Sequence, residues 1–237
     1  LVRWVGIAAG AVIGLLGTRG SFLASSSFPE RRLSPDAVLL HGEQKTILDT
    51  CVGPNQNRKA TEQTMFELSI RILIEYFSVV LVIASLVIAA VLTWLHRGWP
   101  GNSFASRLLN WLLLLSLGAQ GIFTFVGHVF FPNFSAEHIG WQDSPFQYEV
   151  GIADLTVGVL GVLAFWGNFS FRLAAAIAGI VWYWGDAVGH VRQMVLANNY
   201  APGNAGPWFW TDVIVPLLLV VLLCVVWQKE KRAVTRP

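Results

Sequence analysis

The chain has 237 residues, of which 54% are hydrophobic and 13% are charged, and its mean hydropathy is +0.57. Soluble domains carry about 25% charged residues, so this composition excludes an ordinary cytosolic globular protein and a disordered chain. Sixteen basic and fourteen acidic residues leave a net charge of +2, which is too balanced for a surface that binds nucleic acid. The apolar fraction instead predicts that the main partner of the protein is a lipid bilayer.

The first apolar segment, residues 4–18, is short, with Arg3 before it and Arg19 after it. We expect residues 1–24 to form an uncleaved membrane anchor. A signal peptide is the alternative, because a charged start, an apolar core and small residues at 24–26 also fit that pattern. Gly6, Gly10 and Gly14 recur every four residues and predict a smooth face for close helix packing.

A polar connector, residues 25–65, follows on the predicted extracytoplasmic side. It is too long for a simple turn and predicts either an ordered cap or a flexible loop. Residues 66–97 then contain the second predicted span, whose uncharged part covers residues 76–95. Cys51 lies in the connector and Cys224 in an apolar segment, and the chain has no CxxC motif, so neither a dithiol redox centre nor a zinc ribbon is indicated.

Four more segments are long and apolar enough to cross a bilayer, for which a helix needs roughly 20 residues. They are residues 108–127, 150–165, 173–191 and 208–227. We therefore predict an all-α membrane protein with about six transmembrane helices. The last four, residues 105–228, are expected to form an antiparallel four-helix bundle, and residues 229–237 a basic cytoplasmic tail.

The basic residues fall on alternate loops, and such loops face the cytoplasm. Arg97, Arg107 and Arg172 lie on one predicted side together with the basic tail, whereas the opposite loops, residues 132–146 and 198–207, contain no Lys or Arg. This pattern predicts a multi-pass protein of the cytoplasmic membrane with both termini in the cytoplasm.

Ionisable residues interrupt the outer halves of the four predicted bundle helices. A charged group at mid-span costs about 2.5–3.5 kcal/mol on insertion scales, so each needs a partner or a function. Because four helices present acid or imidazole at one depth, we predict a polar site in the extracytoplasmic half. Its candidate residues are His128, Glu149, Asp154, Asp186, His190 and Asp212.

The spacing of these residues leaves several chemistries open. Asp186 and His190 are four residues apart, so they share a helix face and the carboxylate could orient the imidazole. Glu149 and Asp154 are five apart, which turns their faces about 140° from each other. His128, His190, Glu149 and Asp186 could ligate a divalent metal such as Zn, Fe or Mn. The same cluster could pass protons, bind a quinone or another small molecule, or only fix helix packing.

The loop at residues 201–207, APGNAGP, combines two prolines with two glycines and predicts a rigid turn that either covers the acidic cluster or only connects two helices. No P-loop, Rossmann glycine pattern, HExxH or GxSxG motif occurs, so neither nucleotide binding nor standard hydrolase chemistry is supported. Whether the chain is an enzyme stays open.

Three motifs carry a resemblance to a known family: GHVFFP at residues 127–132, PFQYEVG at 145–151 and APGNAG at 201–206. Together they resemble a family of bacterial membrane proteins of unknown function, over about residues 105–228. More distantly, the four-span pattern is similar to DoxX-like and MauE-like proteins. That similarity implies an antiparallel four-helix bundle and a link to quinone-linked sulfur oxidation or thiol chemistry, although this chain lacks a cysteine pair near the cluster.

We therefore expect a bacterial inner-membrane protein that binds a metal, a quinone or another small ligand in a redox-associated role. In this hypothesis His128 and His190 are ligands or proton carriers, and Asp186 orients the imidazole. The first alternative is a non-catalytic accessory subunit of a larger membrane complex. The second is a proton-coupled transporter, which is disfavoured because the inner halves of the spans offer almost no ionisable residues to continue the path.

Overall fold

The computed structural model describes residues 54–97 and 103–234, and every regular element in these two segments is helical. The predictions for residues 1–24, and for the connector up to residue 53, lie outside the described residues. The chain divides into two units, Leu1–Ile72 and Leu73–Pro237. The described part of the first unit belongs to helix α3, Pro54–Glu75, whose side chains are exposed from residue 64 to residue 73.

The second unit begins with α4, Phe77–Leu95, which matches the predicted second span. Its 19 residues carry no charge, and α4 packs against α5, Phe104–Leu112. The buried Ser85 joins the two helices, because its hydroxyl lies 2.8 Å from the Leu81 carbonyl oxygen and 3.1 Å from that of Trp111. Helix α4 therefore packs beside the bundle that the sequence predicted from residue 105 onward.

Helix α5 continues without a break through a π-helical segment, η1, Leu113–Ala119, into α6, Gln120–Phe130. Ser103 begins this rod by accepting the amide of Ser106 on its side-chain oxygen. After Phe131 the chain turns into α7, Pro132–Ile139. A π-helical segment widens the helix by one residue per turn and is frequent at functional sites.

The remaining helices are α8, Phe146–Trp166, α9, Phe169–Ala197, α10, Pro202–Ala205, and α11, Pro207–Val234. Gly167 and Asn168 alone connect α8 to α9, so these helices run antiparallel. The Asn168 side chain caps α9 by accepting the Phe171 amide at 3.0 Å. At the other end Asn198, with φ of 52°, terminates α9.

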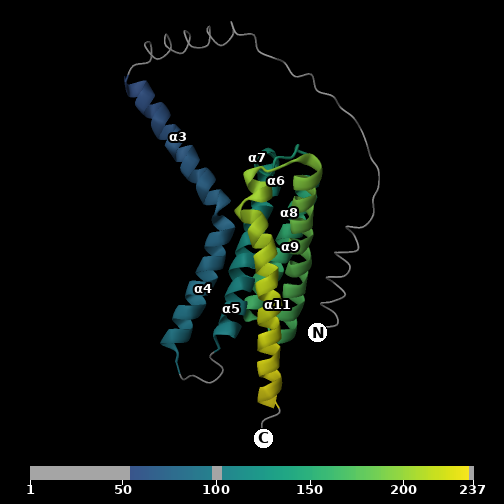
Figure 1. Cartoon of the computed structure of the whole chain (residues 1–237). Helices are drawn as coiled ribbons and strands as arrows, with labels where there is room; N and C mark the ends of the chain where they lie inside the picture. The colour runs from purple at the N-terminus through teal and green to yellow at the C-terminus, as the bar shows by residue number, and fades with distance from the viewer. Residues whose placement is uncertain (1–53, 98–102, 235–237) are drawn as a thin grey trace. The chain divides into compact units, whose positions relative to one another are not determined.

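These helices form a bundle in which α8 lies against α6 and η1, and α9 lies against both α8 and α11 (Figure 1). Its core is made of leucines from the α5–η1 rod and from α11, of which Leu109, Leu112, Leu113, Leu117 and Leu219 are fully buried. The all-α prediction is confirmed for the described residues.

Four segments among the described residues are long and apolar enough to cross a membrane: Phe77–Leu95, Phe104–Phe130, Phe146–Trp166 and Pro202–Arg232. They cover four of the predicted spans. The predicted span at residues 173–191 is also helical, within the 29-residue α9. Helix α9 is not among the four segments, and its membrane crossing stays a prediction.

Glycines bring the η1–α6 rod and α8 into unusually close contact. A Cβ atom added to Gly161 would lie 2.6 Å from both the Gly118 nitrogen and the Leu113 carbonyl oxygen, and one added to Gly121 would lie 2.7 Å from the Asp154 carbonyl oxygen. No real Cβ tolerates such distances to backbone, so the two helices can approach this closely only with glycine there. The contact sets the side chains of α6 beside Asp154.

We therefore expect Gly161→Ala to lower the stability of the protein by about 1–3 kcal/mol, because the new methyl group overlaps backbone that cannot move aside. Thermal unfolding in one detergent measures the effect. Gly185→Ala in α9 is the matched control, since nothing lies within 4 Å of its added Cβ. It should leave stability unchanged or raise it by up to about 1 kcal/mol through helix propensity. Equal losses in both variants would contradict this packing.

Candidate functional site

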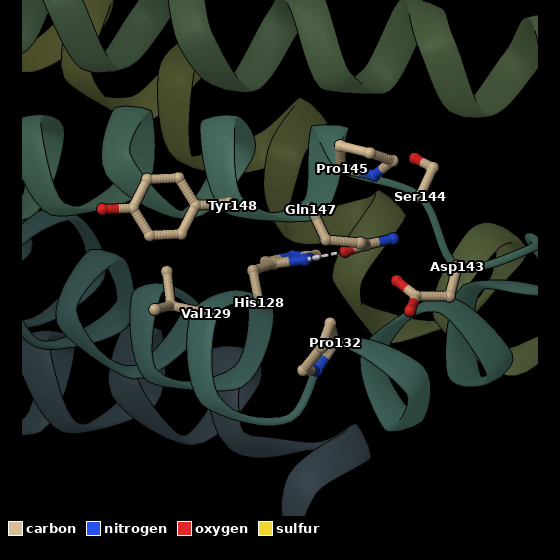
Figure 2. Close-up of a pocket in the computed structure, with 8 residues that line it drawn as sticks. All are labelled: His128, Val129, Pro132, Asp143, Ser144, Pro145, Gln147 and Tyr148. Carbon is tan, nitrogen blue, oxygen red and sulfur yellow. Dashed lines mark hydrogen bonds between the residues drawn. The ribbon is translucent and has the colours of Figure 1, made fainter.

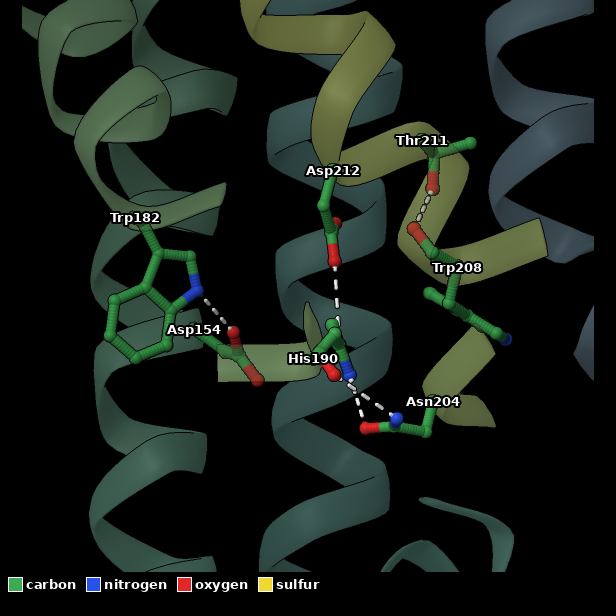
Figure 3. Close-up of polar contacts among 7 residues, drawn as sticks. All are labelled: Asp154, Trp182, His190, Asn204, Trp208, Thr211 and Asp212. Carbon is green, nitrogen blue, oxygen red and sulfur yellow. Dashed lines mark hydrogen bonds and ion pairs between the residues drawn. The ribbon is translucent and has the colours of Figure 1, made fainter. Parts of the chain in front are cut away.

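Asp154 of α8 is 6% exposed and lies inside the bundle. One of its carboxylate oxygens accepts a hydrogen bond from the indole Nε1 of Trp182 on α9, at 2.9 Å (Figure 3). Thr124 and His128, one helical turn apart on α6, lie close enough to interact with the same carboxylate. Asp154 therefore connects α8 to the helices on both of its sides.

Two further carboxylates lie near Asp154. Asp212 of α11 is 6% exposed, and Asp186 of α9 is partly buried. Each of these three carboxylates lies within electrostatic range of another. Within residues 54–97 and 103–234, no Lys or Arg forms an ion pair with any of them. Three helices thus contribute carboxylates that lie within electrostatic range of one another.

His190 of α9 is held by Asn204 of the short helix α10 (Figure 3). The Asn204 amide nitrogen lies 2.8 Å from the Asn199 carbonyl oxygen and 3.3 Å from that of His190, so it donates to both. These two acceptors determine the orientation of the amide, so its Oδ1 atom faces the imidazole. Since Oδ1 only accepts, the His190 Nδ1 atom, 2.8 Å away, carries the proton of that bond.

This arrangement leaves the Nε2 atom of His190 facing the Oδ2 atom of Asp212, at 3.6 Å. In a neutral ring with its proton on Nδ1, Nε2 presents a lone pair. A carboxylate would present lone pairs to it as well, and two facing acceptors repel. The pair is therefore favourable only with one proton shared between His190 and Asp212, as an imidazolium–carboxylate ion pair or as a neutral acid–imidazole bond.

His128 lies at a different place, beside a pocket. Its Nδ1 atom is 2.5 Å from the Oε1 atom of Gln147, which is 5% exposed (Figure 2). The two side chains line an open pocket of about 410 Å³ where the end of α6, the start of α7 and the start of α8 meet. The other lining residues are Val129, Pro132, Asp143, Ser144, Pro145 and Tyr148.

The structure brings together four of the six predicted site residues: Asp154, Asp186, His190 and Asp212. His128 reaches this group only through Asp154. Glu149, in contrast, is exposed, as expected from its position five residues before Asp154 and hence on another helix face. The structure does not bring Glu149 into the site with the others.

The predicted metal site has no support in the described part of the chain. No three His, Cys, Asp or Glu side chains gather there in a way that could hold a metal ion. Of the four proposed ligands, Glu149 is exposed, and the spacing of residues along helices could not show which of the others would meet.

Sequence reasoning missed the neutral residues that hold the ionisable ones. Asn204, Gln147 and Trp182 each donate or accept a bond that fixes a His or Asp. Two of them had a signal, because Gln147 lies in the PFQYEVG motif and Asn204 in the constrained APGNAGP loop. In the structure Asn204 is fully buried.

Asn199 extends this network to α7. Its amide nitrogen lies 2.9 Å from the Ile139 carbonyl oxygen, and its Oδ1 accepts the Ala201 amide at 3.0 Å. Asn199 and Asn204 thus tie the α9–α10 loop to the end of α7 and to His190. This part of the network closes the end of the bundle at which α7 lies (Figure 1).

We expect Asn204→Ala to lower stability by about 1–3 kcal/mol, because it leaves the buried His190 Nδ1 donor and two carbonyl groups without partners. Hydrogen exchange should rise in residues 198–206 and 139–141 and remain unchanged in α5. Asn133→Ala, at a position of α7 outside this network, should have no measurable effect. Unchanged exchange in the Asn204 variant would show that the network does not hold this end together.

The comparison with known proteins agrees with the predicted family in part. No curated protein and no solved structure matches the chain, so the similarity to DoxX-like proteins stays a prediction. A family model matches residues 75–232, which include α4 as well as the bundle. The sequence motifs had placed that helix outside the resemblance. The chain belongs to the family of unknown function DUF6790.

Proposed function

We propose that this protein is a multi-pass protein of the bacterial cytoplasmic membrane whose bundle binds protons in its extracytoplasmic half. The observation that supports this function is the geometry of His190 and Asp212. The Asn204 amide places one imidazole proton on Nδ1. The 3.6 Å approach of Nε2 to the Asp212 carboxylate is then favourable only if a second proton lies between these two groups. Asp154 and Asp186 lie within electrostatic range and add further carboxyl groups for protons.

The orientation follows from the charges at the two ends of the second unit. Lys229 donates to the Ser103 hydroxyl at 2.9 Å, so the basic tail meets the start of α5, near Arg107. At the same end, the Arg172 guanidinium donates to the carbonyl oxygens of Ala164 and Phe165. Basic ends face the cytoplasm. The cytoplasmic position of the C-terminus, and of the N-terminus by the predicted even number of spans, is part of this proposal.

Protons fit the site better than a metal or a quinone in a redox-associated role. Three carboxylates without a Lys or Arg ion pair in the described segments favour a cationic occupant. A metal ion would need at least three His, Cys, Asp or Glu ligands, and no three such side chains lie together among the described residues. The side chains that would donate to quinone carbonyls are already used, since Trp182 donates to Asp154 and His190 to Asn204.

Binding rather than transport is expected, because the opposite half of the bundle is apolar. Leu108, Leu109, Leu112, Leu222 and Leu223 are all buried there. A charged species crossing this layer would lose its hydration without gaining polar partners. The proton site is therefore proposed to communicate with one side of the membrane only.

The shared proton can be tested with Asp212→Asn. The introduced side-chain amide can donate to Nε2 by itself, so His190 should stay neutral, with its proton on Nδ1, over the pH range in which the wild-type pair titrates. In the wild type, the ¹⁵N signals of the His190 ring should shift with pH as the pair gains and loses its proton. NMR of the ¹⁵N-histidine protein in micelles, with His190→Gln to assign the signals, measures this difference.

Glu149→Gln serves as the matched control, since it also neutralises one carboxylate of the bundle but at an exposed position. Its His190 signals should follow those of the wild type. Identical His190 titrations in the wild type and in Asp212→Asn would overturn the proposed proton site.

An accessory structural role is the second candidate, and the Asn199–Asn204–His190 network favours it. These residues mainly bond backbone carbonyl groups, as residues that only fix a fold do. In that case Asp212→Asn would reduce stability while the wild-type His190 signals stay constant with pH.

A further inference from the structure

A stripe of polar residues runs along the rod formed by η1 and α6. Ser116, Gln120, Thr124 and His128 follow one another every four residues, which places them on one helix face. The first two are 0% and 2% exposed, whereas His128 lies at the pocket of Figure 2. This polar stripe therefore leads from the end of the bundle to its interior, deeper than the ionisable residues alone had indicated.

The two deepest residues of the polar stripe have unsatisfied polar atoms. Neither the Oε1 atom of Gln120 nor the Oγ atom of Ser116 has a hydrogen-bond partner within the described part of the protein. Buried polar groups without any partner are rare and costly, and internal water is their usual partner. Both lie in or next to the π-helical segment, a type of distortion common at functional sites.

The polar stripe passes the acidic site on its way. The backbone of Gly121 packs against that of Asp154, and Thr124 and His128, farther along α6, lie within electrostatic range of the Asp154 carboxylate. Further in, the Tyr183 hydroxyl of α9 donates to the Ser116 carbonyl oxygen, at 2.5 Å. Tyr183 in turn lies within electrostatic range of Asp154, Asp186 and Asp212. The polar stripe and the three carboxylates therefore belong to the same polar region of the bundle.

We propose that the polar stripe is a hydrated path that connects the pocket at His128 with the buried aspartates and ends at Ser116. Water enters at the pocket, contacts Asp154 beside Thr124, and occupies the unpaired atoms of Gln120 and Ser116. Protons follow the same path. This inference rests on the proposed proton site, for which it supplies the access route.

His128 is the proton carrier at the entrance of this path. Because its Nδ1 atom donates to Gln147, its Nε2 atom can take a proton from a pocket water and give it to the next water inward, without net change of the ring. The other titratable groups around the path come from α8, α9, α11 and the loop before α8. They are Asp143, Tyr148, Asp154, Tyr183, Asp186, His190 and Asp212.

Accessibility to silver ions tests the path, because Ag⁺ is small and reacts only with thiols that water reaches. In each reaction the thiol releases its proton to water and an S–Ag bond forms. Cys51 and Cys224 are first replaced by serine and alanine. Ser116→Cys and Thr124→Cys then place single thiols on the polar stripe. Remaining thiols are counted by maleimide labelling and mass spectrometry after denaturation.

Ser85→Cys is the matched control for Ser116→Cys, since both serines are 0% exposed but the Ser85 hydroxyl is bonded to backbone outside the stripe. We expect both stripe thiols to react with Ag⁺ at least about tenfold faster than the control thiol, because only a hydrated thiol forms its thiolate readily. Adding His128→Phe should slow the Thr124→Cys reaction to the rate of the control. Thermal unfolding verifies that each variant is folded.

Three results would overturn the path. Stripe thiols as slow as the control thiol would show that the stripe is dry. If Thr124→Cys reacts and a folded Ser116→Cys does not, water does not extend past Gln120 to Ser116. Reaction unaffected by His128→Phe would exclude the pocket as the entrance. None of these changes the His190 titration, so a failure of the path is distinguishable from a failure of the proton site.

Discussion

The close contact between α8 and the η1–α6 rod is the constraint on which the polar interior depends. Glycines at 118, 121, 158 and 161 let the two backbones approach to distances at which no Cβ fits. Lipid provides no hydrophobic drive between helices, so such close packing is a main source of their association. Here it also has a chemical consequence, because it sets Thr124 and His128 within electrostatic range of the Asp154 carboxylate.

Polar atoms that this packing buries must be satisfied inside the bundle, since the bilayer core offers no water. At the α7 end the chain does this with neutral amides, and Asn199 and Asn204 bond backbone carbonyl groups on three segments. That rigid cap also determines which imidazole nitrogen of His190 carries a proton. The three aspartates form no ion pair with a Lys or Arg of the described residues, and Gln120 and Ser116 keep unpaired atoms, and for these reasons we assign protons and water to this interior.

Much of the architecture could be predicted from the sequence, because apolar segments of bilayer length leave few alternatives. The helices at 77–95, 104–130, 146–166 and 207–234 all cover predicted spans. The ionisable residues of the site were also visible as interruptions of these segments. The sequence could not show which of them are neighbours: Glu149 is exposed, and His128 is bonded to Gln147 beside the pocket.

The sequence by itself determined the helical class, the approximate spans and the depth at which carboxylates and imidazoles occur, since each follows from composition along a single helix. Only the tertiary structure decided which of these groups meet, because helix rotation depends on packing between segments far apart in the chain. The Asn204 bond to His190, the Trp182 bond to Asp154 and the unpaired Gln120 oxygen arise from such packing. No periodicity within one helix encodes them.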